Sequence, residues 1–497
     1  MDVEYIVVQA GGKGTRLQYL TENKPKALVP VDNLPMLFHL FERFPDKKFI
    51  IIGDYLSDVL DAYLNTFAKV KYLTVKATGT GTCGGLKQAI SKIPENKSFM
   101  LIWSDLVLTD KFHMPSEEGN YVGISETFPC RWSYKDELFK EEPSSEFGVA
   151  GLFFFTDKTE LKNVPDSGEL VRWMQSENKK YKAWGIGGTK EYGLLEEYKK
   201  TGVKGCRPFN TIYEKDGKLG KQGIDEQGLE LAKKEVAWYK YVEKLGYTKT
   251  PHIYSLDPIV MDRINGKNIY EYVDMPLEKK KEVLKDVVDN LKQLHALESS
   301  STDYFSIKEA YVNKTFNRLQ KIINLVPFAM NETITVNGRV CRNIFYHRKE
   351  IEQMVNDMEV KDFKLIHGDC TFSNMMLEND EKPMLIDPRG YFGFTRMHGD
   401  EAYDWAKVYY SLKGNYDRFN RKEFRLHINE NDVKLEIESS GWEETEDLFF
   451  ELIPVDKRTI KILHALIWLS LTTYAWEDYD SICGAFYNGL YYLEEVL

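Results

Sequence analysis

The stretch Gln9-Ala10-Gly11-Gly12-Lys13-Gly14-Thr15-Arg16-Leu17 decides the fold of the first part of the chain, because it directly follows the apolar run Tyr5–Val8. Similar short apolar runs recur at 49–52, 70–75, 99–103 and 148–155, and a helical pattern spans 34–44. Short buried runs separated by helical segments are typical of a largely parallel sheet that is covered on both faces. We therefore expect a Rossmann-like α/β domain over 1–202. A mixed second part would begin at 148, and a helix over 190–200 would close the domain.

The glycine-rich stretch has the chemistry of a phosphate-binding loop. Its glycines lack the side chains that would keep a phosphate away from the backbone, so their N–H groups can point at phosphate oxygens. Arg16 adds a planar fork of donors, and Lys26 follows within the segment Lys24-Pro25-Lys26. The Lys-Ser/Thr ending of a Walker A loop is missing. The pattern therefore predicts a different class of triphosphate-binding loop.

The run from Gln9 to Val31 resembles the signature of the sugar-1-phosphate nucleotidylyltransferase family, which includes phosphocholine cytidylyltransferases. The resemblance implies a GT-A-like mixed sheet and attack of a substrate phosphate on the α-phosphorus of an NTP. It implies Arg16 and Lys26 as catalytic cations and Asp105, after the strand 99–103, as the Mg²⁺ ligand. It also implies two nucleotide-binding segments, formed by Gln9, Ala10, Gly11, Gly12, Lys13, Gly14 and Thr15 and by Gly79, Thr80, Gly81 and Thr82.

One position departs from this family. Many relatives carry a second metal-binding Asp in a Trp-x-Asp-x-Gly-Thr segment, and the similar stretch here is Trp184-Gly185-Ile186-Gly187-Gly188-Thr189. Ile186 stands where that Asp would be. Another carboxylate would then have to serve, or one metal suffices, or the module is catalytically weakened.

A change of composition at Thr201-Gly202-Val203-Lys204-Gly205 marks the expected domain boundary. Beyond it, strand patterns at 210–213 and 259–264 accompany a helical pattern at 229–242, and later helical patterns follow at 276–297 and 348–358. We therefore expect a second domain over 203–497. It would have a small sheet lobe at about 206–270 and a helical lobe at about 271–497.

The second chemical motif is His367-Gly368-Asp369, with Asn374 five residues later and Asp387 in Leu385-Ile386-Asp387-Pro388. This is the D-x-x-x-x-N spacing of a kinase catalytic loop, in which the Asp accepts the proton of a substrate hydroxyl. The full set resembles the aminoglycoside phosphotransferase/choline kinase family. The resemblance implies a bilobal protein-kinase-like α+β domain, with Asp369 as catalytic base and Asn374 and Asp387 as Mg²⁺ ligands.

A kinase also needs a small-lobe lysine that is paired with a helix glutamate. Lys221 and Glu235 are the candidates, with Lys218 as the alternative to Lys221. The strand 259–264 resembles the hinge that edges the adenine, which places Met261 at the nucleotide.

Two further features of the second domain have open interpretations. Asp404 is expected either to hold the backbone of the catalytic loop or to bind a substrate cation. The Tyr- and Trp-rich region 403–410 is expected to be core, with an aromatic cage for a quaternary ammonium as the alternative.

The composition fits a folded protein that handles small molecules. Hydrophobic residues make up 43% of the 497 residues, which is enough for large buried cores. The formal net charge of −11 gives little support to nucleic-acid binding, and the apolar stretch 462–476 is too short and polar for membrane insertion. The six cysteines are scattered without zinc-ligand spacing and the N-terminus is acidic, so we expect free thiols and a cytoplasmic location.

Together the two modules predict a bifunctional transferase with Mg²⁺ as its cofactor. The kinase would phosphorylate a small alcohol or sugar with ATP. The nucleotidyltransferase would couple that phosphate to a second NTP, with CTP favoured, to give a CDP-alcohol or NDP-sugar for surface polysaccharide such as capsule. The alternatives are a sugar-1-kinase fused to an NDP-sugar pyrophosphorylase, and a regulatory binding protein with one degenerate module.

Overall fold

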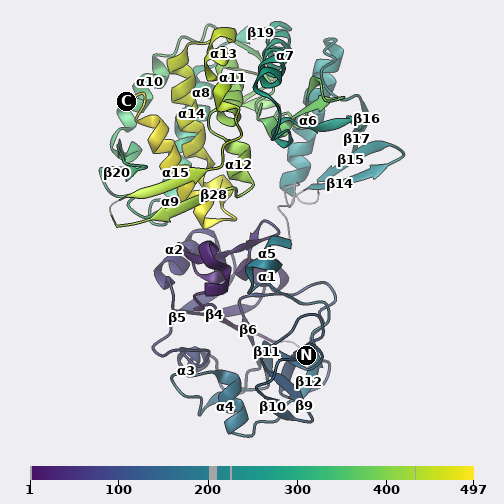
Figure 1. The fold of residues 1–497 in the computed structure, drawn as a ribbon, viewed down its shortest axis with the longest axis vertical. Coiled ribbons are helices and arrows are strands. Elements are labelled where there is room, and N and C mark those ends of the chain that lie inside the picture. Colours follow the sequence, from purple (N-terminus) through teal and green to yellow (C-terminus); the bar gives the residue numbers. More distant parts are fainter. Residues whose placement is uncertain (1–2, 201–209, 224–225, 431) are drawn as a thin grey trace. The chain divides into compact units, whose positions relative to one another are not determined.

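The computed structural model describes residues 3–200, 210–223, 226–430 and 432–497 (Figure 1). The chain divides into two compact units, the first formed by residues 1–203 with 477–479 and the second by 204–476 with 480–497. The boundary predicted at Thr201–Gly205 lies outside the described residues. Among the helices that the structure describes, none has the length and apolar character needed to cross a membrane.

The first unit is built on a nine-stranded mixed sheet. Its centre is the parallel order β6 (Phe99–Trp103), β1 (Tyr5–Gln9), β4 (Lys48–Gly53) and β5 (Lys71–Lys76). Antiparallel β11 (Gly148–Phe155) follows β6 and forms the strand predicted at 148–155. The mixed part does not begin there as predicted, because three of its strands precede residue 148 in the chain. The remaining strands of this sheet are β8 (Tyr121–Ser125), β9 (Ser133–Lys135), β10 (Leu138–Lys140) and β12 (Lys182–Gly185).

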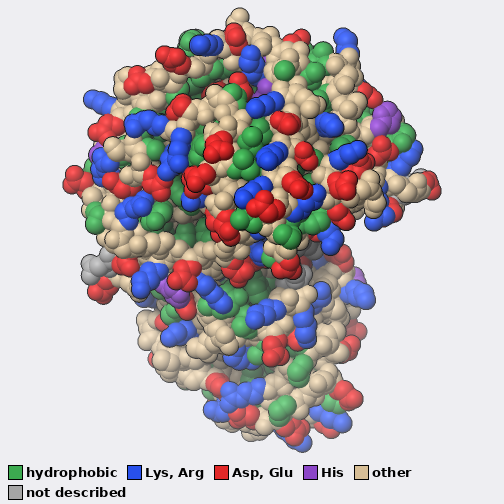
Figure 2. All heavy atoms as spheres, turned by 45° about the horizontal axis from the view of Figure 1, so that its top comes forward, with side chains coloured by type: hydrophobic (Ala, Val, Ile, Leu, Met, Phe, Trp, Pro, Cys, Tyr) green, Lys and Arg blue, Asp and Glu red, His purple; other side chains and the backbone are tan. Residues whose placement is uncertain are grey.

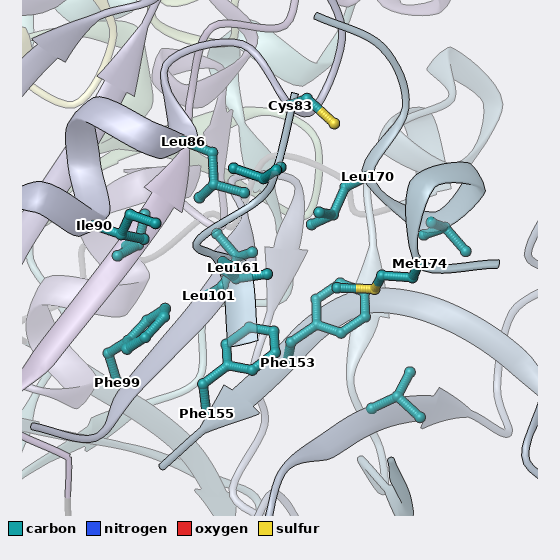
Figure 3. Packing of buried hydrophobic residues seen from close by; sticks show 14 of the residues in the cluster. Cys83, Leu86, Ile90, Phe99, Leu101, Phe153, Phe155, Leu161, Leu170 and Met174 are labelled. Carbon is teal, nitrogen blue, oxygen red and sulfur yellow. The ribbon is translucent and has the colours of Figure 1, made fainter. Parts of the chain in front are cut away.

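Helices cover both faces of this sheet. On one face, Phe41 of α1 (Met36–Arg43) packs on Phe49 of β4, with ring centroids 4.7 Å apart. Beside α1 lies α2 (Ser57–Phe67), whose Tyr63 contacts Phe38. On the other face, α3 (Leu86–Ser91) and α4 (Leu170–Ser176) bury Leu86 and Leu170 against the aromatic rings of β11 (Figure 3). The sheet is therefore a buried middle layer, as its apolar strands predict.

The helix predicted over 190–200 is wrong in its first half. Lys190–Glu191 form strand β13, which pairs with β7 (Leu106–Val107), and the helix α5 spans only Leu195–Lys200. The Tyr192 N–H donates to the carbonyl of Asp105 at 3.0 Å, which holds this segment extended. Tertiary pairing therefore overrides the local helical pattern.

Short elements connect the main ones in the first unit. They are the 3₁₀ segments Thr15–Thr21, Lys26–Leu28 and Lys158–Leu161 and the strand pair β2 (Pro30–Val31) and β3 (Leu34–Pro35).

The second unit begins with a four-stranded antiparallel sheet and a long helix. The strand order is β14 (Asn210–Lys215), β15 (Lys218–Gly223), β17 (Ile259–Asp262) and β16 (Ile253–Leu256). The helix α6 (Glu226–Lys244) contacts β15 and buries Trp238 and Val242.

The rest of the second unit is largely helical around one aromatic-rich core. Its long helices are α7 (Leu277–Ala296), α9 (Lys314–Ile322), α10 (Arg348–Asn356), α11 (Glu401–Leu412), α14 (Lys457–Leu471) and α15 (Tyr479–Leu493). Shorter helical segments are α8 (Tyr304–Lys308), the π-helical turn Glu309–Asn313, α12 (Tyr416–Asn420) and α13 (Glu446–Leu452).

The helical lobe also contains strands that the sequence patterns did not predict. Two sheets have the orders β18 (Gly266–Asn268), β23 (Met375–Glu378), β24 (Lys382–Leu385) and β19 (Ser299–Ser301), β22 (Asp362–Leu365), β27 (His398–Gly399). A third has the order β21 (Arg339–Arg342), β20 (Thr333–Val336), β29 (Val433–Ile437), β28 (Phe424–Ile428). Asn337-Gly338 turns between β20 and β21 with both residues at positive φ, which is a recognisable hairpin signal.

The described cysteines are free and buried, as predicted. Cys83 and Cys130 lie in the first unit and Cys341, Cys370 and Cys483 in the second, whereas Cys206 lies outside the described residues. Burial raises the pKa of the Cys83 thiol to about 11 and that of Cys130 to about 12.

A buried carboxylate fixes the turn at His367-Gly368. The oxygens of Asp404 on α11 accept the backbone N–H groups of His367 at 2.9 Å and Gly368 at 2.7 Å. The ring of His295 on α7 contacts the same carboxylate at 3.0 Å. Burial alone would lower the pKa of His295, but the carboxylates of Asp404 and Glu401 raise it above its ordinary value. Asp404 therefore holds backbone rather than remaining free for a substrate cation.

This pairing predicts a pH-dependent stability. A histidine whose folded pKa is raised contributes most below its ordinary value of about 6.5, and the contribution is lost as pH rises through the folded pKa. The His295→Asn variant should therefore lose about 3–5 kcal/mol of unfolding free energy at low pH, because Asp404 stays buried without its partner. The difference from wild type should shrink as the pH of urea titrations rises above about 6.5. The His427→Asn change at an exposed site is the control, and a constant difference would contradict the pairing.

The core in Figure 3 predicts a large loss of stability in the first unit. Phe153 is fully buried in β11, the strand that lies between β6 and β8. Phe153→Ala should therefore lower the unfolding free energy by about 3–5 kcal/mol, as measured by urea titration followed by fluorescence. Leu138→Ala in β10, where the side chain is 52% exposed, should change it by only about 0.5 kcal/mol. Equal losses would contradict this assignment of the core.

Candidate active sites

The glycine loop leaves the carboxyl end of β1, where ligands bind in open α/β sheets. Gly11 is required by packing, because a Cβ atom there would lie 2.7 Å from the Cβ of Asp54. Gly14 has a φ of 65°, in the left-handed region that favours glycine. A Cβ atom on Gly12 would meet nothing within 4 Å, so this part of the loop is open. Ala10 is buried, and its N–H group donates a hydrogen bond to the carbonyl of Ile52.

The second glycine-rich segment lies beside the first, because the side-chain amide of Gln9 donates to the Thr82 carbonyl at 2.6 Å. Its glycines have a structural reason of their own. A Cβ atom on Gly79 would lie 1.6 Å from the carbonyl oxygen of Asp166, and one on Gly81 would lie 2.4 Å from that of Gly168. The Thr80 N–H donates to the Ser167 hydroxyl at 3.0 Å. The segment is therefore fixed by the loop 166–168.

A cluster of opposite charges lies at the carboxyl end of β6. Asp105 is buried and its carboxylate forms an ion pair with the Lys26 ammonium. Glu191 on β13 lies beside them and is 3.8 Å from the Arg16 guanidinium. Burial, and then the charge of Asp105, raises the pKa of Glu191. The structure thus brings together three of the four charged residues that were predicted for this site, Arg16, Lys26 and Asp105, and adds Glu191. The fourth, Lys13, instead lies over the ring of Tyr55, 5.5 Å from its centre.

Glu191 is the residue of this site that the sequence patterns missed. Ile186, at the position of the expected second acid, is 1% exposed and belongs to the core. The nearest signal was an acid two residues after Thr189, in a segment whose pattern indicated a helix. Its proximity to Asp105 depends on the pairing of β13 with β7, which puts Glu191 opposite Leu106.

In the second unit, Lys221 joins the small sheet to two carboxylates. Its ammonium lies 2.8 Å from Glu235 on α6 and 2.7 Å from Asp387. Burial alone would lower the pKa of Lys221, but these two carboxylates raise it, so the amine stays charged. Lys218, the alternative, instead lies over the ring of Tyr254. Met261 is buried in β17, next to Leu219 of β15.

The loop after β22 brings the other predicted kinase residues together. The side-chain amide of Asn374 donates to the Asp369 carboxylate at 3.2 Å and to its carbonyl at 2.9 Å. The Ile386 N–H donates to the Asn374 carbonyl at 3.0 Å, which places Asp387 beside this loop. Lys407 on α11 forms an ion pair with Asp369 at 2.9 Å.

Both clusters have the ligand types that Mg²⁺ prefers beside phosphates, namely carboxylate and amide oxygens. In the first unit the buried carboxylate of Asp105 is paired with Lys26, and Glu191 next to it lies 3.8 Å from Arg16. In the second unit Asp387 is about half exposed, with 47% of its side chain accessible, while Lys221 occupies one of its oxygens. These residues therefore fit the predicted metal.

The second unit has a further group of charged residues that the sequence patterns did not single out. Lys314, Arg318, Arg389 and Lys407 surround Tyr403 near Asp369. Over the face shown in Figure 2, basic and acidic side chains are interspersed.

The comparisons with known proteins concern the first unit. Residues 6–114 match the model of the MobA-like NTP transferase domain. A bifunctional protein GlmU of Methanococcus maripaludis is 27% identical over 169 residues, which cover 33% of this chain and 36% of that protein. A glucose-1-phosphate thymidylyltransferase of Streptomyces griseus is 34% identical over 125 residues, or 24% of this chain and 32% of that protein. The aligned stretch thus spans about a third of the length of these relatives.

Solved structures similar to this chain include HddC from Yersinia pseudotuberculosis, at 20% identity and a TM-score of 0.35, covering 40% of this chain and 98% of HddC. They also include the CTP:phosphocholine cytidylyltransferase LicC from Streptococcus pneumoniae, at 20% identity and a TM-score of 0.31, covering 40% of this chain and 97% of LicC. From the match of residues 6–114, with the glycine loop and Asp105 inside them, the first unit carries a MobA-like NTP transferase domain.

Proposed function

We propose that this chain is a bifunctional transferase that makes a nucleotide-activated small molecule in two steps. The second unit phosphorylates an alcohol or sugar with ATP, and the first unit joins that phosphate to a nucleotide and releases pyrophosphate. CTP is the favoured second NTP and surface polysaccharide is the proposed destination of the product. The observation that carries the first activity is the NTP transferase match over a glycine loop beside Lys26 and Asp105.

In the first unit, the chemistry requires cations and little covalent work. The open backbone at Gly12 binds the triphosphate, and Arg16 and Lys26 neutralise charge that develops on the leaving pyrophosphate. Mg²⁺ held by Asp105 and Glu191 would polarise the α-phosphate. Lys26, which pairs with Asp105, is placed to bind phosphate oxygens of the nucleotide instead, and Asp105 would then be available to hold Mg²⁺.

The kinase activity is supported by the arrangement around Lys221. A buried lysine on a sheet strand, a helix glutamate and an aspartate after a short strand are the parts that hold ATP phosphates in kinases. Asp369 is placed to accept the proton of the acceptor hydroxyl as its oxygen attacks the γ-phosphorus, with ADP as the leaving group. Asn374 and Asp387 would hold Mg²⁺, which neutralises the transferred phosphoryl group.

A regulatory binding protein with a degenerate module is the competing reading. Ile186 favours it, because the usual second acid of the transferase module is absent at that position. Glu191 answers this objection, because it brings a second carboxylate to Asp105 from another strand.

The two activities should be separable by single substitutions. Asp105→Asn should lower pyrophosphate release by about 100-fold or more and leave ADP formation intact. Asp369→Asn should do the reverse, because it removes the proton acceptor. Both are measured on the full chain with ATP, the four other NTPs and a panel of small alcohols, sugars and their phosphates. Mass spectrometry of the product identifies the acceptor.

Each variant is the control for the other, because Asp105→Asn should keep ADP formation and Asp369→Asn should keep pyrophosphate release. Pyrophosphate release from none of the NTPs with any phosphate would overturn the transferase proposal. Loss of both activities in one variant would contradict two independent sites.

The role of Glu191 has its own test. Glu191→Gln should weaken Mn²⁺ binding to the full chain with CTP by about tenfold or more, as measured by electron paramagnetic resonance, because one of two carboxylates is lost. Glu196→Gln, on exposed α5, is the matched control and should leave Mn²⁺ binding unchanged. Unchanged Mn²⁺ affinity in Glu191→Gln would show that Asp105 works without it.

A further inference from the structure

The residues next to Asp369 carry an excess of positive charge. Lys314 and Arg318 lie one turn apart on α9, Arg389 follows Asp387, and Lys407 lies on α11. The Lys314 ammonium is 5.4 Å from the centre of the Tyr403 ring, and Arg389 donates to the Tyr403 hydroxyl at 3.2 Å. Lys407 lies 5.8 Å from the centre of the same ring, so three cations contact one tyrosine. Arg318 lies over the ring of Tyr474, and its charge interacts with that of Tyr403.

Few anions balance these cations. Lys407 is paired with Asp369 at 2.9 Å. Arg318 donates to the Ser470 carbonyl, which is neutral. Within the described ranges, no carboxylate lies within ion-pair distance of Lys314, Arg318 or Arg389. Even with Tyr403 ionised, four positive charges face two negative ones.

Two pKa shifts support this imbalance. Burial, and then the neighbouring cations, lowers the pKa of Lys314 to about 8. Burial alone would raise the pKa of the Tyr403 phenol, but Lys314, Lys407 and Arg389 lower it to about 7. The lowered pKa of Tyr403 means that the neighbouring cations stabilise negative charge at this position.

The aromatic rings of this region are not available for a quaternary ammonium. Lys314 and Lys407 lie over Tyr403, and Lys407 also lies 5.3 Å from the centre of the Tyr410 ring. An aromatic cage attracts a cation only when its faces are open to it, and a second cation here would meet like charges. The site is thus the opposite of a choline-type pocket.

The cation cluster is also accessible from solvent. Lys314, Arg318 and Arg389 are each half-buried, as is Asp369. The buried hydroxyl of Tyr410 has no hydrogen-bond partner among the residues that the structure describes. Half-buried cations without carboxylate partners, beside a proton acceptor, are the groups that recognise a bound anion.

We propose that the acceptor of the kinase carries a carboxylate or another anionic group, bound by Lys314, Arg318 and Arg389, and that its hydroxyl faces Asp369. This rests on the proposed kinase function and names its substrate class as hydroxy acids and acidic sugars. The anionic group fixes the acceptor, and the reacting hydroxyl is held where Asp369 accepts its proton.

The test compares matched acceptors on the full chain. Glycerate is paired with glycerol, and glucuronate and galacturonate with glucose and galactose, with choline as the cationic arm. By the measured rate of ADP formation, at least one acid should have a kcat/KM about tenfold or more above that of its neutral partner, because charge-assisted hydrogen bonds are gained. Equal or better use of neutral sugars or choline would overturn the inference and leave the kinase function standing.

Variants assign the effect to the cluster. Arg318→Gln and Lys314→Gln should each raise the KM for the acid by about tenfold and leave the KM for ATP unchanged. Lys321→Gln, an exposed lysine on the same helix, is the matched control. A raised KM for ATP with an unchanged KM for the acid would mean that the cations hold nucleotide phosphates, which also overturns the inference.

Direct binding separates the two proposals. Titration calorimetry with glucuronate, galacturonate and glycerate should detect binding of at least one acid to wild type and its loss in Arg318→Gln. Binding without phosphotransfer to any acceptor would support the anion site and contradict the kinase. Absence of binding for all three acids, with ADP formed on a neutral acceptor, would contradict the anion site alone.

Discussion

The relative positions of three elements in the second unit depend on the side-chain amine of Lys221. Lys221 lies between Glu235 and Asp387, so a strand of the small sheet, a helix and the loop after β24 all meet at one buried charge. Moving any of these elements would leave a charge in the interior without its partner, which is costly. The same contact fixes the position of strand β15, which carries Lys221, against the loop after β24 that carries Asp387. Stability and geometry are therefore determined by the same ion pairs.

Both candidate sites contain an ion pair between a lysine and an aspartate. In the first unit Lys26 neutralises Asp105 in the absence of nucleotide, and in the second Lys407 neutralises Asp369. Each pair places a lysine ammonium directly against a carboxylate of a candidate active site. Asp404 has the complementary role, since it is fully satisfied by backbone and by His295 and holds the loop without contacting a substrate.

Sequence patterns predicted the features that are local in the chain. The glycine loop, the strand before Asp105 and the spacing from Asp369 to Asn374 are contiguous, so their residue types reveal them. The role of Glu191 was not predicted, because Asp105 is distant in sequence and the two side chains come together only through the pairing of β13 with β7. The position of Lys314 and Arg318 near Asp369 was not predicted, because two basic residues one turn apart on an amphipathic helix usually indicate a solvated face. The hairpin at Asn337-Gly338 was predictable, since its turn residues have a clear preference.

The reactivity of the buried cysteines depends on the opening of the unit in which each of them lies. Burial raises the pKa values of the Cys83, Cys130 and Cys341 thiols and disfavours their thiolates, so alkylating reagents react slowly while the fold is closed. Cys83 and Cys130 become reactive only when the first unit opens, and Cys341 and Cys370 only when the second does. The cysteines that the structure describes thus form an internal set of alkylation sites, with which the opening of the two units can be followed separately.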